Sequence, residues 1–246
     1  MMTQKSFADQ SAEVLTYRLV GQEPFIFVRY GDGALECIAG KTGGTCDGEL
    51  YSKSLAEDLV RCWNLLFTRP EQVVIGHWLS ASFDNGSVSN RYEGPYQTLI
   101  SQAPNTGINP TFIHFESLLL MRDSVELVNF YKAVRNDKRK KLLMGPTTWA
   151  PAADALNTAF YGIPVIKDLH ALKDEIRIGL DLRDFDVLLY GAGMAGNIPV
   201  IDHWNANPEK TYINLGSALD PLYRGRTRKQ QLDYSSSCVF MGKVCS

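Results

Sequence analysis

The stretch FIFVRYGDG, residues 25–33, begins as a continuous apolar run and ends in arginine, glycine and aspartate. A short apolar run rich in aromatic and β-branched residues and bounded by glycine is typical of a buried strand. Arg29 and Asp32 then lie at the carboxyl end of that strand, the edge at which open α/β sheets bind ligands. Gly31 and Gly33 allow a close backbone approach there. The segment indicates a site for an anionic or polyhydroxylated ligand; a charged turn in which Asp32 caps the next helix is the alternative.

Apolar runs alternate with helical patterns along the rest of the chain. Strands are expected at residues 25–30, 73–78, 111–115, 141–145, 163–167, 186–190 and 211–215. Helices are expected at residues 8–20, 54–67, 117–135, 151–160, 169–179 and 195–205. This alternation predicts an α/β, Rossmann-like fold in which a mostly parallel sheet carries helices on both faces.

No internal repeat or low-complexity linker divides the chain, so we expect one domain spanning residues 1–246. Two stretches interrupt the alternation. Residues 40–52 are rich in glycine and polar side chains, and residues 79–110 show little periodicity. A connection as long as the second one predicts a long insertion or lid-like loop, with a short helix at residues 95–102 as the alternative.

The composition is that of an ordinary globular protein, with 45% hydrophobic and 21% charged residues. A net charge of -2 provides no general attraction to nucleic acid or anionic membranes. No apolar run approaches the roughly 20 residues of a membrane span. Five cysteines form no C-x-x-C pair, and the four histidines are scattered. We therefore expect a reduced, cytoplasmic protein without a zinc cluster.

A second glycine turn, GAGMAG at residues 191–196, follows the predicted strand 186–190 and precedes a predicted helix. Gly191, Gly193 and Gly196 match the dinucleotide fingerprint G-x-G-x-x-G in its strand–turn–helix context. Backbone N–H groups of such a loop can surround a diphosphate. The late position and the absence of an acidic residue at the end of the next strand weaken a nicotinamide interpretation. A sugar nucleotide and a tight packing turn both remain open.

A third segment on the same sheet edge follows the predicted strand 211–215. It contains Ser217 and Asp220, and then a run of cations. Those cations include Arg224, Arg226 and Arg228. They suit a diphosphate leaving group or a phosphodiester backbone, and a solvated basic loop is the alternative.

Several side chains could act as a general base, and the sequence does not rank them. Glu36 lies four residues after Asp32 and shares the side of a helix that would begin near Gly33. His77, His114 and Glu116 lie at or near the ends of predicted strands, although a lone histidine is more often a structural hydrogen-bonding residue. Trp149 could stack on a base or sugar, and a core position is the alternative.

With these residues in view, the chain resembles the GT-D glycosyltransferases, first described as domain of unknown function 1792. The resemblance lies in VRYGDG at residues 28–33 and, more loosely, in NLGSALD at residues 214–220. It implies a Rossmann-like sheet, a nucleoside-diphosphate sugar donor (a UDP-sugar being favoured) and transfer of a hexosyl or pentosyl group. The acceptor would be a hydroxyl group of a glycan, a protein or a hydroxymethylated DNA base.

One departure from the family concerns the metal. The Asp-x-Glu metal motif of the family falls on residues 32–34, where Ala34 replaces the glutamate and cannot ligate a metal. Either Glu36 substitutes for it beside Asp32, or Mn²⁺ or Mg²⁺ binding is weaker or absent. In the second case the three arginines of the basic run would stabilise the departing diphosphate.

The resulting hypothesis is a glycosyltransferase with Asp32, Glu36 and His114 as catalytic residues and Asp32 as the metal ligand. Donor-binding residues would be Arg29, Gly31, Gly33, Gly191, Gly193, Gly196, Ser217, Asp220, Arg224, Arg226 and Arg228. An NAD(P)-dependent oxidoreductase built on the glycine loop is one alternative. A non-catalytic nucleotide-sugar binding module is another, and Ala34 keeps it open.

Overall fold

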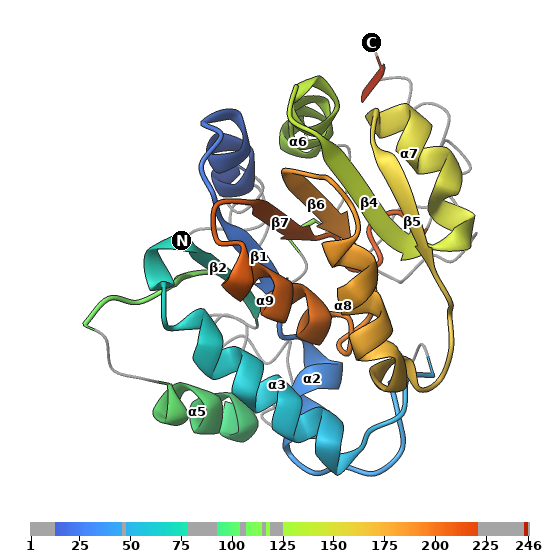
Figure 1. Ribbon diagram of the computed structural model, residues 1–246. Helices are drawn as coiled ribbons and strands as arrows, with labels where there is room; N and C mark the ends of the chain where they lie inside the picture. The colour runs from blue at the N-terminus through green and yellow to red at the C-terminus, as the bar shows by residue number, and fades with distance from the viewer. Residues whose placement is uncertain are drawn as a thin grey trace.

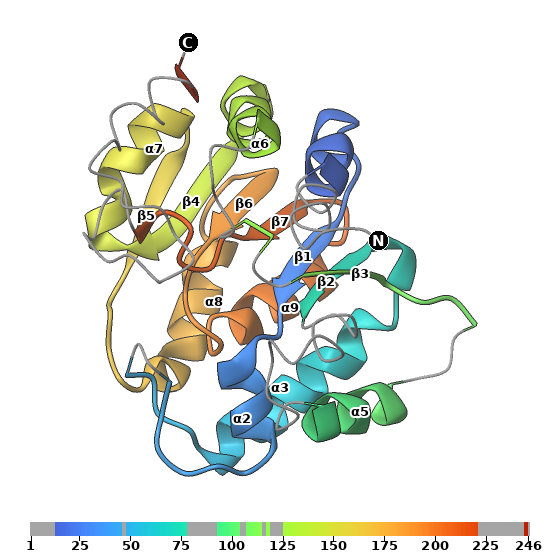
Figure 2. The same cartoon turned by 180° about the vertical axis from the view of Figure 1, so that it is seen from behind.

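The computed structural model describes residues 13–45, 48–77, 93–103, 107–114, 117–118, 125–220 and 244–245. Within them seven parallel strands form one sheet in the order β3-β2-β1-β7-β6-β4-β5. In Figure 2 this order runs from right to left, with β5 at the left edge. The strands are β1 (Ile26–Arg29), β2 (Val73–His77), β3 (Thr111–His114), β4 (Lys141–Pro146), β5 (Ala159–Ile163), β6 (Val187–Tyr190) and β7 (Thr211–Asn214). The predicted α/β class is confirmed, with a sheet that is parallel throughout the described strands.

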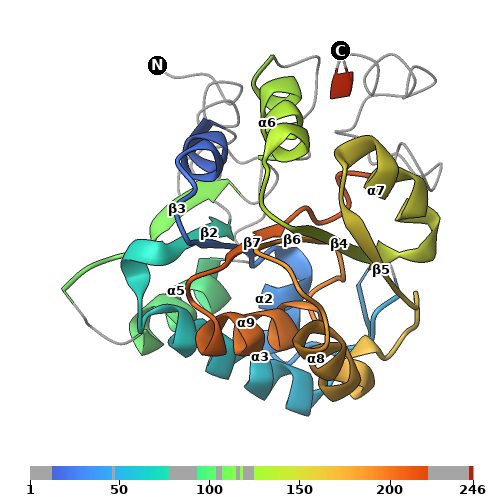
Figure 3. The same ribbon diagram turned by 45° about the horizontal axis from the view of Figure 1, so that its top comes forward.

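Helices cover both faces of the sheet (Figures 1 and 3). One face carries α2 (Asp32–Ile38), α3 (Lys53–Leu66), α5 (Glu93–Gln102), α8 (Lys173–Asp181) and α9 (Asn197–Ala206). The other carries α6 (Val125–Asn136), α7 (Ala150–Leu156) and the helical residues 13–20. None of the helices in the described ranges combines the length and the hydropathy that crossing a bilayer requires.

The interior strand β1 shows how the sheet is buried on both faces. Successive side chains of a strand point to opposite faces. Ile26 and Val28 accordingly pack in the core cluster beneath α3 and α9, whereas Phe25 and Phe27 pack in the cluster on the other face. A parallel sheet covered by helices on both sides reads as a continuous apolar run, which explains the sequence of β1.

The carboxyl ends of β1 and β7 form a switch point in the topology. After β1 the chain turns to one face, where Ala34 and Leu35 of α2 join the first core cluster. After β7 the chain turns to the other face, where Ala218 and Leu219 join the second cluster. The two neighbouring strands pair in parallel, so their diverging connections leave a crevice between them. Ligands of open α/β sheets bind at such a point.

Two predicted elements near β5 were wrong. The strand expected at residues 163–167 is instead Ala159–Ile163, and the helix expected to reach residue 160 ends at Leu156. Asn157 ends that helix because it adopts the left-handed conformation (φ 55°, ψ 55°), a common helix C-cap. The strand stops before Pro164, whose nitrogen cannot donate to a ladder. Residues 164–166 therefore form a loop.

The remaining differences concern irregular segments and helix starts. The helix α2 was not among the expected helices, although one beginning near Gly33 was considered. The helix predicted at residues 117–135 begins at Val125, and residues 117–118 form a turn. Within the expected insertion, α5 bears out the short-helix alternative. Residues 79–92 and 104–106 of that insertion lie outside the described residues, so its lid-like character stays a prediction.

Candidate functional site

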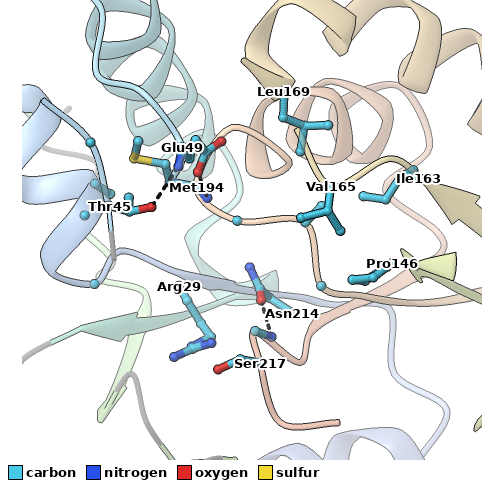
Figure 4. Close-up of a pocket in the computed structure, with 18 of the residues that line it drawn as sticks. Arg29, Thr45, Glu49, Pro146, Ile163, Val165, Leu169, Met194, Asn214 and Ser217 are labelled. Carbon is cyan, nitrogen blue, oxygen red and sulfur yellow. Dashed lines mark hydrogen bonds between the residues drawn. The ribbon is translucent and has the colours of Figure 1, made fainter. Parts of the chain in front are cut away.

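A cavity of about 470 Å³ opens at the carboxyl edge of the sheet, beside the β1–β7 switch point. The ends of β1, β4 and β7 and the glycine turn after β6 form its floor. Residues 44, 45, 49 and 51 and residues 163–166 and 169 also line it, several of them labelled in Figure 4. The opening segment of the sequence, the glycine turn and the start of the third segment therefore meet in one site, as predicted from their shared sheet edge.

Arg29 is the last residue of β1 and lies half-buried in the cavity lining. Its guanidinium lies against Gly216, whose φ of +58° places it in the left-handed region. A methyl group at Gly216 would overlap Nη1 of Arg29. Glycine is thus required at residue 216 both by its backbone conformation and by the close approach of Arg29.

Buried asparagines connect the ends of β1, β6 and β7. The Nδ2 group of Asn197 donates to the backbone oxygen of Arg29 at 2.9 Å, and its Oδ1 accepts from Tyr190 Oη at 3.0 Å. Asn214 Nδ2 donates to the same Oδ1 at 2.8 Å, while Asn214 Oδ1 accepts from the Gly216 amide at 2.7 Å. A satisfied buried network of this kind fixes the geometry of the strand ends. Sequence reasoning did not identify Asn197, because nothing local marks a buried asparagine.

Carboxylates occupy the polar side of the cavity. Asp32 is exposed, and its Oδ1 accepts from the Gly33 amide at 2.9 Å. Glu36 accepts from Lys41 Nζ at 2.8 Å and from Tyr51 Oη at 2.9 Å. Burial, followed by the hydrogen bond to Glu36, raises the pKa of Tyr51, so its hydroxyl stays protonated and keeps donating. Asp32 and Glu36 therefore face the same cavity, and Glu36 is held in place from two sides.

The glycine turn binds an internal carboxylate. Glu49 is buried, and its Oε2 and Oε1 accept from the backbone amides of Met194 and Ala195, each at 3.0 Å (Figure 4). Gly193 has a φ of +60°, and a Cβ there would lie 2.6 Å from Glu49 Oε2. The amides that a dinucleotide fingerprint offers to a diphosphate are here bonded to Glu49. Sequence reasoning missed this residue, which lies 145 positions before Met194.

The other predicted donor-binding residues divide between lining and packing positions. Gly31, Gly33, Gly191, Ser217 and Asp220 line the cavity. Gly196 is instead packed against Ala192, and a side chain there would overlap that residue.

Asp220 is buried, and its Oδ1 accepts from Trp149 Nε1 at 3.0 Å. Trp149 also lies against Gly191, which has no room for a side chain. The buried indole therefore serves as part of the wall, held by the Asp220 carboxylate.

The two strand histidines lie outside the cavity lining. His77 and His114 face each other in register at the ends of β2 and β3, and both are buried. Burial lowers the pKa of His77 to about 3 and, together with the charge of Arg29, that of His114 to about 4. Both rings are thus neutral at physiological pH. The predicted catalytic role of His114 gains no support from its location, and Glu116 lies outside the described residues.

The charges of the described lining are unbalanced. Arg29 faces four carboxylates, those of Asp32, Glu36, Glu49 and Asp220. Nowhere in the described ranges do three or more histidine, cysteine, aspartate or glutamate side chains gather closely enough to hold a metal ion by themselves. The arginines predicted to steady a leaving group, Arg224, Arg226 and Arg228, lie outside the described residues.

The opposite side of the cavity is apolar. It is lined by Pro146, Ile163, Pro164, Val165, Ile166 and Leu169, four of which are labelled in Figure 4. Val165 and Ile166 remain 60% and 43% exposed, which is unusual for adjacent aliphatic side chains at the rim of a cavity.

The fold of this chain matches those of solved structures. A selenomethionine-substituted structure of domain of unknown function 1792 matches with a TM-score of 0.59 and 16% identity, over 94% of this chain and 89% of that one. A second structure is described as showing that this highly conserved domain has a distinct glycosyltransferase fold. It matches with a TM-score of 0.57 and 16% identity, over 94% of this chain and 89% of that one. The chain shares the fold of domain 1792.

A third structure, described as a new glycosyltransferase (DUF1792) from Streptococcus sanguinis, matches with a TM-score of 0.57 and 15% identity. It aligns over 90% of this chain and 85% of that one. No family model matches the sequence, and a search of curated proteins gives no significant match. The resemblance drawn from residues 28–33 and 214–220 is therefore confirmed at the level of the fold.

Proposed function

We propose that the protein is a glycosyltransferase that moves a hexosyl or pentosyl group from a nucleoside-diphosphate sugar, in the favoured case a UDP-sugar, to a hydroxyl acceptor. The observation that supports this most strongly is the cavity at the β1–β7 switch point. There Arg29 and the carboxylates of α2 meet at the ligand-binding edge of a fold shared with structures described as glycosyltransferases.

Arg29 is the residue we assign to the diphosphate. It is the cation of the described lining, and Gly216 leaves room for its guanidinium. A guanidinium forms two parallel charge-assisted hydrogen bonds with a phosphate group. The Asn197 side chain bonds the Arg29 carbonyl, which fixes the backbone from which this side chain extends.

Asp32 is the residue we assign to a divalent cation. A departing diphosphate needs positive charge beside it, and carboxylates outnumber cations in the described lining. Mg²⁺ is commonly held by one or two carboxylates together with substrate phosphates, so an exposed Asp32 fits a metal that arrives with the donor. When bound, such an ion would neutralise charge on the leaving group. Ala34 cannot contribute, and Glu36 is already bonded to Lys41 and Tyr51.

Glu36 is our candidate for the group that takes the proton of the acceptor hydroxyl if transfer inverts the anomeric centre. Lys41 and Tyr51 hold both of its carboxylate oxygens, which orients it on the polar side of the cavity. The acceptor would be a glycan, a protein or a hydroxymethylated base in DNA. A cytoplasmic location stays an expectation.

A panel of UDP-, ADP- and GDP-sugars, with NAD and NADP alongside, tests this proposal. Ligand binding raises the melting temperature by mass action, and the stabilising donor is then assayed for transfer and hydrolysis. Arg29→Ala and Asp32→Asn should abolish the shift or the turnover. Arg177→Ala, which removes a surface ion pair within α8, should not. A shift with NAD alone would favour the oxidoreductase, and binding without turnover the binding module. No shift with any nucleotide sugar would refute the proposal.

A further inference from the structure

The loop that carries Val165 and Ile166 is anchored on both sides. Ile163 belongs to β5, which pairs along its length with β4. On the far side the Lys167 carbonyl accepts from the Leu50 amide at 2.8 Å, and Leu169 is buried. The Asp168 side chain accepts from the Ala171 amide and so caps the following turn. The two exposed apolar side chains therefore project from a segment whose ends are fixed.

The cavity is divided by polarity. Arg29 lies on one side, and Ile163, Val165 and Leu169 lie on the other (Figure 4). Asp32 and Glu36 also line the cavity. Within the described residues, no protein hydrogen bond involves the backbone N–H or C=O of Val165 or Ile166. The segment thus offers an apolar surface beside polar backbone groups that a ligand can use. Pockets of 300–1,000 Å³ with this combination are typical of small-ligand sites.

We propose that residues 164–166 form the nucleobase subsite of the donor, an inference that rests on the proposed glycosyltransferase function. In a nucleoside-diphosphate sugar the least polar surface is that of the flat faces of the base; the phosphates, ribose and transferred sugar are polar or charged throughout. The base therefore matches the apolar side, while the diphosphate matches Arg29 across the cavity. Contact with Val165 and Ile166 provides affinity, and the free backbone groups of the loop meet the polar edge of the base.

Substitutions at these two side chains test the subsite without endangering the fold, because both are exposed. We compare Val165→Ala, Ile166→Ala and the double variant with Leu182→Ala as the control. Leu182 is 80% exposed and does not line the cavity. The probes are UDP, which carries a base, and inorganic pyrophosphate, which does not, both measured by calorimetric titration.

Each single variant should weaken UDP binding about three- to tenfold, from the loss of one or more apolar carbons at a contact, and the double variant more. Pyrophosphate affinity should not change in any variant, and the control should bind both probes as the wild type does. Wild-type UDP affinity in the double variant would overturn the subsite while the proposed function stands. Equal loss of UDP and pyrophosphate affinity also overturns it. A wild-type protein that binds no nucleotide removes the proposed function, and this inference with it.

Discussion

Replacing Gly216 with alanine should displace the Arg29 side chain, and the resulting loss of donor affinity can be measured apart from the loss of fold stability. The added methyl group has two effects. A non-glycine residue at φ +58° costs about 1–2 kcal/mol of folding free energy. The methyl group also occupies the place of the Arg29 guanidinium. Because that group is the end of a flexible side chain, the side chain should move while the backbone stays.

The size of the binding effect follows from the contacts that Arg29 would lose. Hydrogen bonds to a charged group contribute about 1.5–3 kcal/mol, and about 1.4 kcal/mol corresponds to tenfold in affinity. Gly216→Ala should therefore weaken the binding of the nucleotide sugar by roughly 10- to 150-fold. Gly107→Ala is the matched control, because Gly107 also has a positive φ (+74°) but a Cβ there would meet nothing within 4 Å. It should lose similar stability and no affinity.

Two measurements decide the matter. Urea unfolding compares the two alanine variants, and calorimetric titration with the best donor compares their affinities. A double-mutant cycle then adds Arg29→Ala: once the guanidinium is gone, Gly216→Ala should cost no further affinity. The reasoning is refuted if Gly216→Ala binds the donor as well as Gly107→Ala does, or if its effect persists in full without Arg29.

Three further predictions follow from the same contacts. Asp32→Asn should lower turnover at least tenfold and raise the Mn²⁺ or Mg²⁺ concentration that gives half the maximal rate. Metal titration after chelation measures both, and turnover unaffected by chelation would contradict the metal role. Glu49→Gln replaces one acceptor oxygen with an NH2 group, so one of the two bonds to the glycine turn is lost and the other is no longer charge-assisted; the free energy of unfolding should fall by about 1–3 kcal/mol in urea titrations. Burial lowers the pKa of His114 and of His203 to about 4, so the unfolded chain takes up their protons first as pH falls below 6.5. The contribution of each of these histidines to stability should be constant above about pH 7 and fall by about 2 kcal/mol between pH 6.5 and 5, and His203→Gln should flatten that slope.

The central sheet could be predicted because its sequence signal is local. Residues 25–33 show a buried run that ends in glycine and charge, and the structure places them at the middle of the sheet and the edge of the cavity. The same reasoning placed residues 191–196 and the strand ending at Asn214 on that edge. Parallel strands share one carboxyl edge, so identifying the strands is enough to bring their following turns together.

The region around β5 could not be predicted because its signals compete. Residues 163–167 are apolar and β-branched, so they read as a strand, and residues 151–160 read as one helix. The structure shortens the helix at Asn157 and moves the strand back to Ala159–Ile163. The difference changes the site: in a strand the backbone of Val165 would pair with β4, whereas in the loop Val165 lines the cavity and stays 60% exposed.

Long-range hydrogen bonds were beyond sequence reasoning for a different reason. Asn197 and Glu49 each act through a partner more than 140 residues away, and no spacing records such a pairing. The polar, glycine-rich composition of residues 40–52 marked an irregular loop. It did not mark which of its carboxylates would be buried.

The glycine turn shows why a motif match and a binding site are separate questions. The G-x-G-x-x-G pattern reflects requirements of the backbone and its packing. Gly191 leaves room for the Trp149 ring, Gly193 adopts a positive φ, and Gly196 allows the chain to pack against Ala192. All three requirements are met here by packing alone. The amides that would reach a diphosphate are bonded to Glu49, so a phosphate could use them only by displacing a buried carboxylate with two hydrogen bonds. The cation of the described lining is Arg29, across the cavity at the end of β1. We therefore assign an anionic donor first to the Arg29–Asp32 turn, and the glycine turn contributes to the lining of the cavity.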